Sequence, residues 1–225
     1  MDELARLERR LGYRFRERAY LVRALTHRSA AAANNERLEF LGDAVLGMVV
    51  ADFLFRSDVG YSEGDLTRLR ASLVNRETLA DVAQALEIGD VLRLGPGELK
   101  SGGFRRRSVL ANALESIIGA IYLDGGIEAA AKFIHASFGQ LFASLPDPST
   151  LKDPKTRLQE LLQERGLGLP EYETLSVSGP AHRQVFKVAC RIPALELEAR
   201  AEGASRRGAE QAAAQRLLEE IGHGS

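Results

Sequence analysis

Apolar residues recur at helical spacing through the first three-fifths of the chain. Ser108 precedes one apolar run and Gly125 and Gly126 follow it, which are typical start and stop signals of a helix. No convincing alternating strand separates these segments. We therefore expect an all-helical domain, and its helical segments are residues 2–11, 17–26, 36–55, 65–87, 108–123 and 127–143.

The pattern changes after a proline-containing stretch, residues 144–154. An amphipathic helix with Pro154 at its start is followed by three alternating segments and an Ala-rich helix. This α-β-β-β-α order is typical of a small α+β domain in which two helices cover one face of an antiparallel sheet. Its segments are residues 154–165, 172–178, 184–190, 195–201 and 205–221. The predicted boundaries are 1–145 for the helical domain, 146–153 for a linker and 154–225 for the α+β domain.

Charge alone does not indicate a nucleic-acid partner. The formal net charge is −1, residues 1–150 hold 19 Lys and Arg against 20 Asp and Glu, and residues 151–225 hold 11 of each. Phosphate binding would therefore need local basic patches, such as the Gly-rich loop 95–107. Cys190 is the single cysteine, so no internal disulfide can form, and it is expected to be a small core residue. A charged N-terminus and the lack of a long apolar run predict a cytoplasmic protein without a membrane span.

Residues 36–47 carry the most informative pattern in the chain. At 100° per residue, Glu36, Glu39 and Asp43 fall within about 60° of one another on a helix, whereas Leu38, Leu41, Val45 and Val49 face the opposite side. Such an acidic stripe is usually a solvated face. Two details favour a site instead: no Lys or Arg follows any of these acids at the fourth position, and Phe40 lies beside the stripe, where an aromatic indicates an interface. Gly47 is expected to let a helix or a ligand approach closely.

A second helix can complete the site. Asn112 and Glu115 are spaced three residues apart on one face, with isoleucines opposite. If this helix packs against the first, their oxygens would converge with those of Glu39 and Asp43 on one cation. Hard oxygen ligands suit Mg²⁺, for which Mn²⁺ can substitute. His27, beside Thr26 at a helix end, is expected to be structural, and no Ser–His–Asp or Cys–His arrangement is evident.

These segments resemble the bacterial ribonuclease III family nearly end to end. The resemblance is carried by ERLEFLGDAVL (36–46), THRSA (26–30), EGDLTRLRASLV (63–74), GELKSGGFRRRSVLANALESIIGAIYLD (97–124) and KDPKTRLQELLQ (152–163). It implies an all-α endonuclease domain that forms a homodimer, followed by a double-stranded-RNA-binding domain. It also implies Mg²⁺-dependent hydrolysis of duplex RNA to 5′-phosphates and short 3′ overhangs, in the processing of rRNA and other structured precursors.

The resemblance assigns roles to individual residues. Glu39, Asp43 and Glu115 fall on metal-binding carboxylates, of which Asp43 and Glu115 are the catalytic pair. Glu36 and Glu63 fall on acids that engage RNA and shape the active site. Phe40 falls on the aromatic that is inserted into a partner subunit. Asn112 stands where the family often has Asp, so it can still ligate a cation but contributes no charge.

The α+β domain is expected to read the shape of duplex RNA through 2′-hydroxyls and phosphates. Many relatives carry further lysines at the start of the last helix, whereas this chain has Glu210 nearby, which predicts a modest affinity. Arg105, Arg106 and Arg107 in the Gly-rich loop can guide phosphates towards the acids. The residues expected to contact RNA within the α+β domain are Thr156, Gln159, Gln163, His182, Ser205, Arg206 and Arg207.

Two alternatives to a nuclease stay open at this stage. Because Asn112 lacks a charge, the chain could bind duplexes without cutting them. A small-molecule enzyme on the helical scaffold is a further alternative, but it would leave the RNA-reading domain unexplained.

Overall fold

A computed structural model describes residues 3–57, 60–181 and 183–223. The chain divides into two compact units, Met1–Pro148 and Ser149–Ser225. The first unit is helical and the second combines helices with a sheet, so the predicted order of an all-α domain followed by an α+β domain is confirmed.

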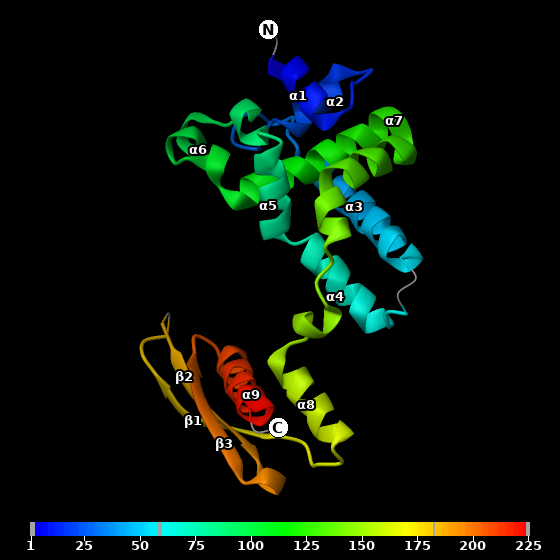
Figure 1. Ribbon diagram of the computed structural model, residues 1–225. Coiled ribbons are helices and arrows are strands. Elements are labelled where there is room, and N and C mark those ends of the chain that lie inside the picture. Colours follow the sequence, from blue (N-terminus) through cyan, green and yellow to red (C-terminus); the bar gives the residue numbers. More distant parts are fainter. Residues whose placement is uncertain (1–2, 58–59, 182, 224–225) are drawn as a thin grey trace. The chain divides into compact units, whose positions relative to one another are not determined.

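The first unit is built from α-helices joined by short turns (Figure 1). Within its described residues, the only β pairing is an isolated bridge between Thr26 and Arg93. The α-helices are α1 (Glu3–Leu11), α2 (Arg18–Ala24), α3 (Glu36–Arg56), α4 (Glu63–Leu73), α5 (Arg76–Ala85), α6 (Pro96–Lys100) and α7 (Arg107–Ala143). The 3₁₀ segments are η1 (Ile88–Val91), η2 (Gly103–Arg105) and, at the junction of the two units, η3 (Pro148–Leu151).

Three predicted segments differ in detail because local capping and backbone geometry override the periodicity. The predicted helix 65–87 is two helices, since the Asn75 side chain accepts a hydrogen bond from the Thr78 N–H at 2.9 Å and starts α5 anew. The predicted helices 108–123 and 127–143 are both parts of α7, which kinks at Gly126, where φ is 79°. The loop 95–107 contains the short α6 and η2.

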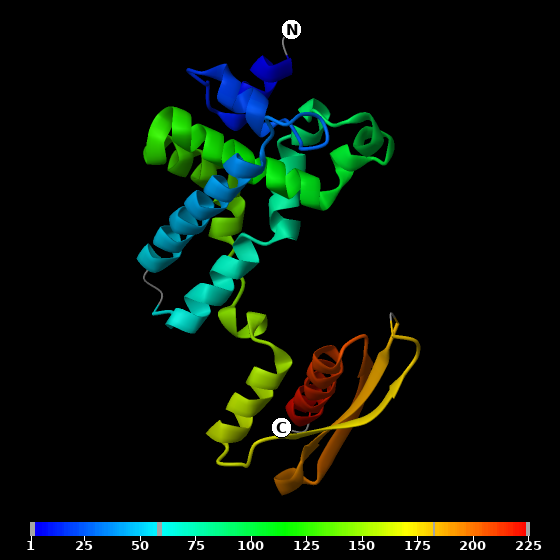
Figure 2. The same cartoon turned by 180° about the vertical axis from the view of Figure 1, so that it is seen from behind.

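Helices α3 and α7 lie side by side at the centre of this unit (Figures 1 and 2). Their backbones nearly touch: a Cβ at Gly42 would lie 1.7 Å from the Glu115 carbonyl oxygen, and a Cβ at Gly119 would lie 2.3 Å from the Leu38 carbonyl oxygen. The close approach therefore occurs at Gly42 and not, as the sequence suggested, at Gly47, where an added Cβ would meet nothing within 4 Å. The apolar sides of both helices, including Leu46 and Val50 of α3, are buried.

The second unit has the order α8 (Pro154–Glu164), β1 (Glu171–Ser178), β2 (Val185–Ile192), η4 (Pro193–Leu195), β3 (Leu197–Gly203) and α9 (Arg206–His223). The strands form an antiparallel sheet in the order β1-β2-β3. A register shift between Thr174 and Ser176 marks a bulge in β1. Asp153 caps α8, because its carboxylate accepts hydrogen bonds from the backbone N–H groups of Lys155 and Thr156.

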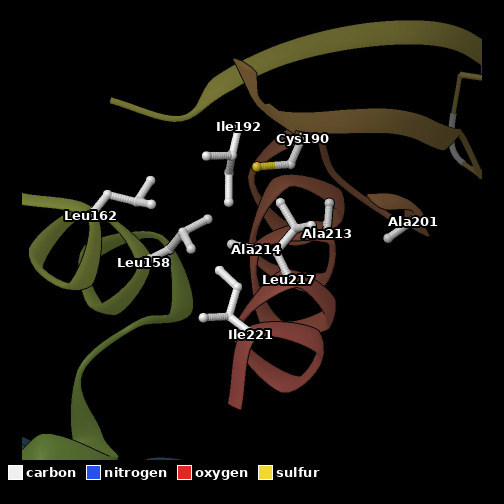
Figure 3. Close-up of a cluster of buried hydrophobic side chains, with 9 residues drawn as sticks. All are labelled: Leu158, Leu162, Cys190, Ile192, Ala201, Ala213, Ala214, Leu217 and Ile221. Atoms are coloured by element: carbon white, nitrogen blue, oxygen red, sulfur yellow. The ribbon is translucent and has the colours of Figure 1, made fainter. Parts of the chain in front are cut away.

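A buried apolar cluster holds α8 and α9 against the sheet (Figure 3). Cys190 of β2 is fully buried in this cluster, which confirms that it is a small core residue. Burial of such side chains is the main favourable contribution to the folding of a unit of this size. The residues of the cluster are Leu158, Leu162, Cys190, Ile192, Ala201, Ala213, Ala214, Leu217 and Ile221.

Candidate active site

A cleft of about 670 Å³ in the first unit collects most of the side chains that the sequence singled out. Six of the predicted positions line it from α3 and α7: Glu36, Glu39, Phe40, Asp43, Asn112 and Glu115. The two helices can place these residues together because Gly42 and Gly119 allow their backbones to approach closely. The acidic stripe of α3 therefore meets Asn112 and Glu115 because α3 and α7 cross at this point.

The electrostatics of the cleft disfavour the ionised form of its deepest acid. Burial raises the pKa of Glu115 to about 7, and the negative charges of Asp43 and Glu39 act in the same direction. Burial also raises the pKa of Glu39, with a further contribution from Glu36. A hydrogen bond from Asn112 acts on Glu39 in the opposite direction. The fold therefore brings carboxylates together at a free-energy cost that a bound cation would offset.

The donor set of the cleft fits a hard divalent cation. Among the polar groups of the cleft, the carboxylates of Glu39, Asp43 and Glu115 and the amide oxygen of Asn112 offer oxygen ligands. Oxygen ligands are the ones that Mg²⁺ and Mn²⁺ prefer. Within the described part of the chain, no three His, Cys, Asp or Glu side chains are already arranged as a metal cage. Carboxylate side chains have several accessible rotamers, so those that line the cleft can turn towards a cation. The amide of Asn112 would supply one ligand without adding to the repulsion.

Some predicted residues lie elsewhere in the unit. Glu63 opens α4 and lines a separate groove with Met48 and Phe55. The Arg107 guanidinium pairs with Glu77 and with Asp81 of α5. These three residues therefore form an ion-pair network that ties the start of α7 to α5.

The other two arginines of the Gly-rich loop also differ from each other. Arg105 lies over the ring of Phe104, with 5.1 Å from its guanidinium carbon to the ring centroid. Arg106 does line the cleft, where it pairs with Glu98 at 2.7 Å. Of the three predicted loop arginines, Arg106 is therefore the one that the structure places beside the acids.

Several residues of the cleft were not predicted as site residues. His27 and Arg28 come from the turn after α2, Glu98 comes from α6, and Ser108 lies in the first turn of α7. The Arg28 guanidinium nitrogen Nη1 lies 3.5 Å from Oε1 of Glu36. Their positions depend on contacts between segments far apart in the sequence, so periodicity along one helix could not identify them; the nearest signal was the THRSA match at 26–30.

Phe40 is 82% exposed although it is a large aromatic on a central helix. Met48 and Phe55, also on α3, are exposed as well. An exposed apolar stripe on one helix is typical of a surface that another protein covers. The unusual position of Phe40 on the helical wheel is thus matched by its exposure.

In the second unit, the predicted RNA-contacting residues lie on α8 and at the start of α9. Gln159 and Gln163 are exposed on α8, while the Thr156 hydroxyl donates to the Asp153 carboxylate at 2.7 Å. Ser205 accepts a hydrogen bond from the Gly208 N–H at 3.1 Å and so caps α9. His182 lies outside the described residues.

Basic side chains at the same end of this unit share one carboxylate. Glu210 is buried and accepts from Lys155 at 2.5 Å and from Arg206 at 2.9 Å. Burial alone would raise the pKa of Glu210, but the hydrogen bonds from the two cations outweigh it and hold that pKa below its ordinary value. Lys155 also lies 4.3 Å from the centroid of the Tyr172 ring. Arg207, next to Arg206, is exposed.

Comparisons with known proteins agree with this division. Residues 17–141 match the Ribonuclease-III-like family, and residues 154–221 match the double-stranded RNA binding motif. The chain is 55% identical to Ribonuclease 3 of Bordetella avium, over 96% of this chain and 86% of the relative. It is 53% identical to Ribonuclease 3 of Pseudomonas aeruginosa, over 98% of this chain and 96% of the relative.

A solved structure supports the fold of the first unit. The nuclease domain of a ribonuclease III from Campylobacter jejuni matches with a TM-score of 0.61 and 43% sequence identity, covering 63% of this chain and all of that chain. No helix within the described residues has the length and apolar content that a membrane span requires.

Fold and site together define a two-domain nucleic-acid enzyme, with a helical nuclease unit followed by a unit that binds double-stranded RNA. The chain belongs to the ribonuclease III family, and its activity is that of a double-strand-specific endoribonuclease.

Proposed function

We propose that the cleft between α3 and α7 hydrolyses phosphodiester bonds of duplex RNA with Mg²⁺, for which Mn²⁺ can substitute. The observation that carries this proposal is the group of carboxylates that the two helices hold together in the cleft. Burial and the negative charges of Asp43 and Glu39 all disfavour the ionised form of Glu115. In this assignment Asp43 and Glu115 are the catalytic pair. Glu39 and Asn112 complete the set of cation ligands, and Glu36 shapes the site beside them.

The residues of the cleft would act by position and charge. A divalent cation bound there would lower the pKa of a bound water molecule and neutralise charge on the scissile phosphate. Asp43 and Glu115 would hold it from two different helices, so the rigid crossing at Gly42 sets where the phosphate must lie. Asn112 would orient Glu39 through the hydrogen bond between them. Arg106 at the same cleft can attract the RNA backbone.

We further propose that the protein acts as a homodimer through the exposed face of α3. Phe40 is 82% exposed, and Met48 and Phe55 extend the apolar surface. The similar Campylobacter structure concerns a region involved in dimer formation of its own nuclease domain. Glu63 lines a groove with Met48 and Phe55, so a second subunit on this face would bring Glu63 next to the interface. Two active sites would cut both strands and leave 5′-phosphates and short 3′ overhangs.

The second unit would hold the duplex while the first unit cuts it. Gln159 and Gln163 on α8 offer neutral hydrogen-bonding groups that suit 2′-hydroxyls in a minor groove. Arg206 and Arg207 at the start of α9 place positive charge where phosphates would lie. Structured precursors such as rRNA, in the cytoplasm, are the proposed substrates.

The proposal is tested with a perfect RNA duplex of about 30 base pairs, long enough for the roughly 16 base pairs that an RNA-binding domain of this type spans. Labelled duplex is incubated with the protein in Mg²⁺ or in EDTA, and products are separated on a denaturing gel. We expect Mg²⁺-dependent cuts on both strands with short 3′ overhangs. A shifted but uncut duplex in Mg²⁺ would instead support a protein that binds without cutting.

Two variants locate the chemistry in the cleft. Asp43→Asn keeps the side-chain shape but removes a charge, so we expect cleavage to fall by at least about 10²–10³-fold, the scale on which one preorganised electrostatic group acts. Binding in EDTA should persist, and its loss would contradict the division of labour between the two units. Asn112→Asp is the matched variant that gains a negative charge. If Asn112 is a ligand, this variant should need a lower Mg²⁺ concentration for half-maximal cleavage.

A further inference from the structure

The turn after α2 contributes His27 to the catalytic cleft. The backbone of this turn is held on two sides. The His27 N–H donates to the Arg93 carbonyl at 3.0 Å, and the Arg93 N–H donates to the Leu25 carbonyl at 2.9 Å. The Asn35 N–H, at the start of α3, donates to the Thr26 carbonyl at 2.9 Å. His27 therefore has a fixed backbone position relative to the acidic helix.

Hydrogen bonds also fix the chemical state of its ring. The Ser29 backbone N–H donates to His27 Nδ1 at 3.2 Å, so Nδ1 must present a lone pair. The Ser29 hydroxyl lies 2.8 Å from the same nitrogen. Its oxygen already accepts from the Gly95 N–H at 2.9 Å, so its own proton can point to the ring. With Nδ1 acting as an acceptor, the ring proton is on Nε2.

The Nε2–H group is the part of this ring that is left for a ligand. It has no hydrogen-bond partner among the residues that the structure describes. A nitrogen that carries a proton cannot ligate a cation, but it can donate a hydrogen bond to an anionic acceptor that enters the cleft. Phosphate oxygens are strong charged acceptors and receive a large share of the hydrogen bonds between proteins and nucleic acids.

We propose that His27 is a positioning residue: its Nε2–H donates to a non-bridging phosphate oxygen of the RNA strand in the cleft. Ser29 supports this contact because it keeps Nδ1 a hydrogen-bond acceptor, and the Gly95 N–H holds the Ser29 hydroxyl in place. The inference rests on the proposed cleavage of RNA at this cleft. It gives His27 a contact to substrate in place of the purely structural role that its sequence position suggested.

Three variants separate the contact from the scaffold. His27→Ala removes the donor, and we expect a loss of about 10- to 100-fold in the single-turnover rate, as for a hydrogen bond to a charged group. His27→Gln restores an N–H donor of similar reach and should recover part of that loss. Ser29→Ala keeps the ring and the backbone N–H that donates to Nδ1 but removes the hydroxyl beside it, so a smaller loss is expected. Thermal unfolding of each variant is measured alongside, because a merely structural role would lower the unfolding temperature.

The decisive measurement pairs protein variants with modified substrates. Duplexes carry one methylphosphonate, which replaces a non-bridging phosphate oxygen by a methyl group, at each position near the cut in turn. At one position the modification should slow the wild-type protein as much as His27→Ala does, and it should slow His27→Ala no further. Such non-additivity is the signature of two changes that remove the same contact.

The outcomes separate this inference from the proposed function. Wild-type cleavage of the unmodified duplex tests the function, and the coupling between His27→Ala and methylphosphonate tests the contact. The affinity of each protein variant for each modified duplex is also measured in EDTA, so the contact is tested even if no cleavage occurs. Penalties that multiply at every position would overturn the proposal. So would non-additivity with a single 2′-deoxy substitution in place of methylphosphonate, since it would assign the contact to a sugar.

Discussion

Glu115 in the helical unit and Glu210 in the RNA-binding unit are both carboxylates drawn away from water, yet their surroundings are opposite. The charges that act on Glu115 are the negative ones of Asp43 and Glu39, and its pKa rises to about 7. Glu210 accepts hydrogen bonds from Lys155 and Arg206, and its pKa is held below the ordinary value. The charges that act on Glu115 are therefore of its own sign, whereas Glu210 has two cations beside it.

The two units also differ in the kind of apolar surface that they expose. The second unit closes its apolar cluster between two helices and a sheet, with Leu158, Leu162 and Cys190 fully buried. The first unit leaves Phe40 and Phe55 exposed on its central helix. The nuclease unit thus combines clustered negative charge in its cleft with exposed aromatic side chains on α3. Within its described residues, the RNA-binding unit also exposes large apolar side chains, such as Leu169 and Val177, but these are aliphatic, and its Lys155 and Arg206 are already paired with Glu210.

The largest expected effect comes from separating the two helices that create the acidic cleft. Gly42→Ala would place a Cβ 1.7 Å from the Glu115 carbonyl oxygen, a backbone atom that cannot move alone. We expect a loss of about 3 kcal/mol or more in the free energy of unfolding, together with loss of cleavage. Gly47→Ala is the control on the same helix: an added Cβ meets nothing within 4 Å, and Ala in a helix interior stabilises by about 0.5–1 kcal/mol. Urea denaturation compares them, and equal midpoints would contradict the close crossing.

Phe40→Ala tests whether the exposed surface of the nuclease unit belongs to a dimer. Removing a large apolar side chain from an interface costs about 1.5–3 kcal/mol. A symmetric dimer loses one from each subunit, which corresponds to a dimer about 10²- to 10⁴-fold weaker. Leu99→Ala removes another exposed apolar side chain, on α6, and should leave association unchanged. Sedimentation velocity over a concentration series measures both variants. An unchanged dimer for Phe40→Ala would mean that this surface serves another partner or none.

Glu115 makes the nuclease unit depend on pH when no divalent cation is bound. Its pKa in the folded protein, about 7, is higher than its ordinary value of 4.5. The folded state therefore binds this proton more tightly than the unfolded state, and stability in EDTA should fall as pH rises from about 4.5 through about 7. Glu115→Gln should remove this dependence and be more stable than wild type at pH 8, by about 1–3 kcal/mol after allowing for solvent screening.

The measurement is thermal unfolding from pH 4 to pH 9. Mg²⁺ at pH 8 should raise the unfolding temperature of the wild type more than that of Glu115→Gln. Parallel pH curves for the two proteins in EDTA would show that Glu115 is not the group responsible.

The smallest effect is expected in the RNA-binding unit, where the charge is already compensated. Glu210→Gln weakens the acceptor shared by Lys155 and Arg206, so the unfolding free energy should fall by about 1–2 kcal/mol. Glu202→Gln removes the same charge from an exposed pair with Lys187 at 3.7 Å, and such surface pairs contribute about 0–1 kcal/mol. Because both variants gain equally in net charge, a difference in duplex affinity at matched salt would come from the positions of Lys155 and Arg206. Equal stability and equal affinity would show that Glu210 does not position them.

Much of this protein could be read from local patterns. Apolar residues at helical spacing around α3 and α7 reflect which faces must be buried, as does the alternation along β3, and burial is the main force in folding. The acidic stripe of Glu36, Glu39 and Asp43 followed from the geometry of a single helix. Phe40 stood out for the same reason. These features depend on residues a few positions apart, so the sequence is sufficient to find them.

The tertiary structure alone decided which residues from different segments meet. It placed the helix crossing at Gly42 instead of Gly47, because close approach depends on where two helix axes cross and not on the sequence of either. It divided the arginines of the loop, leaving Arg106 at the cleft while Arg107 pairs with α5. It also brought His27 to the acids through backbone hydrogen bonds to Arg93, 66 residues away in the chain. Contacts of this kind carry no periodic signal, because they arise only when the whole unit has packed.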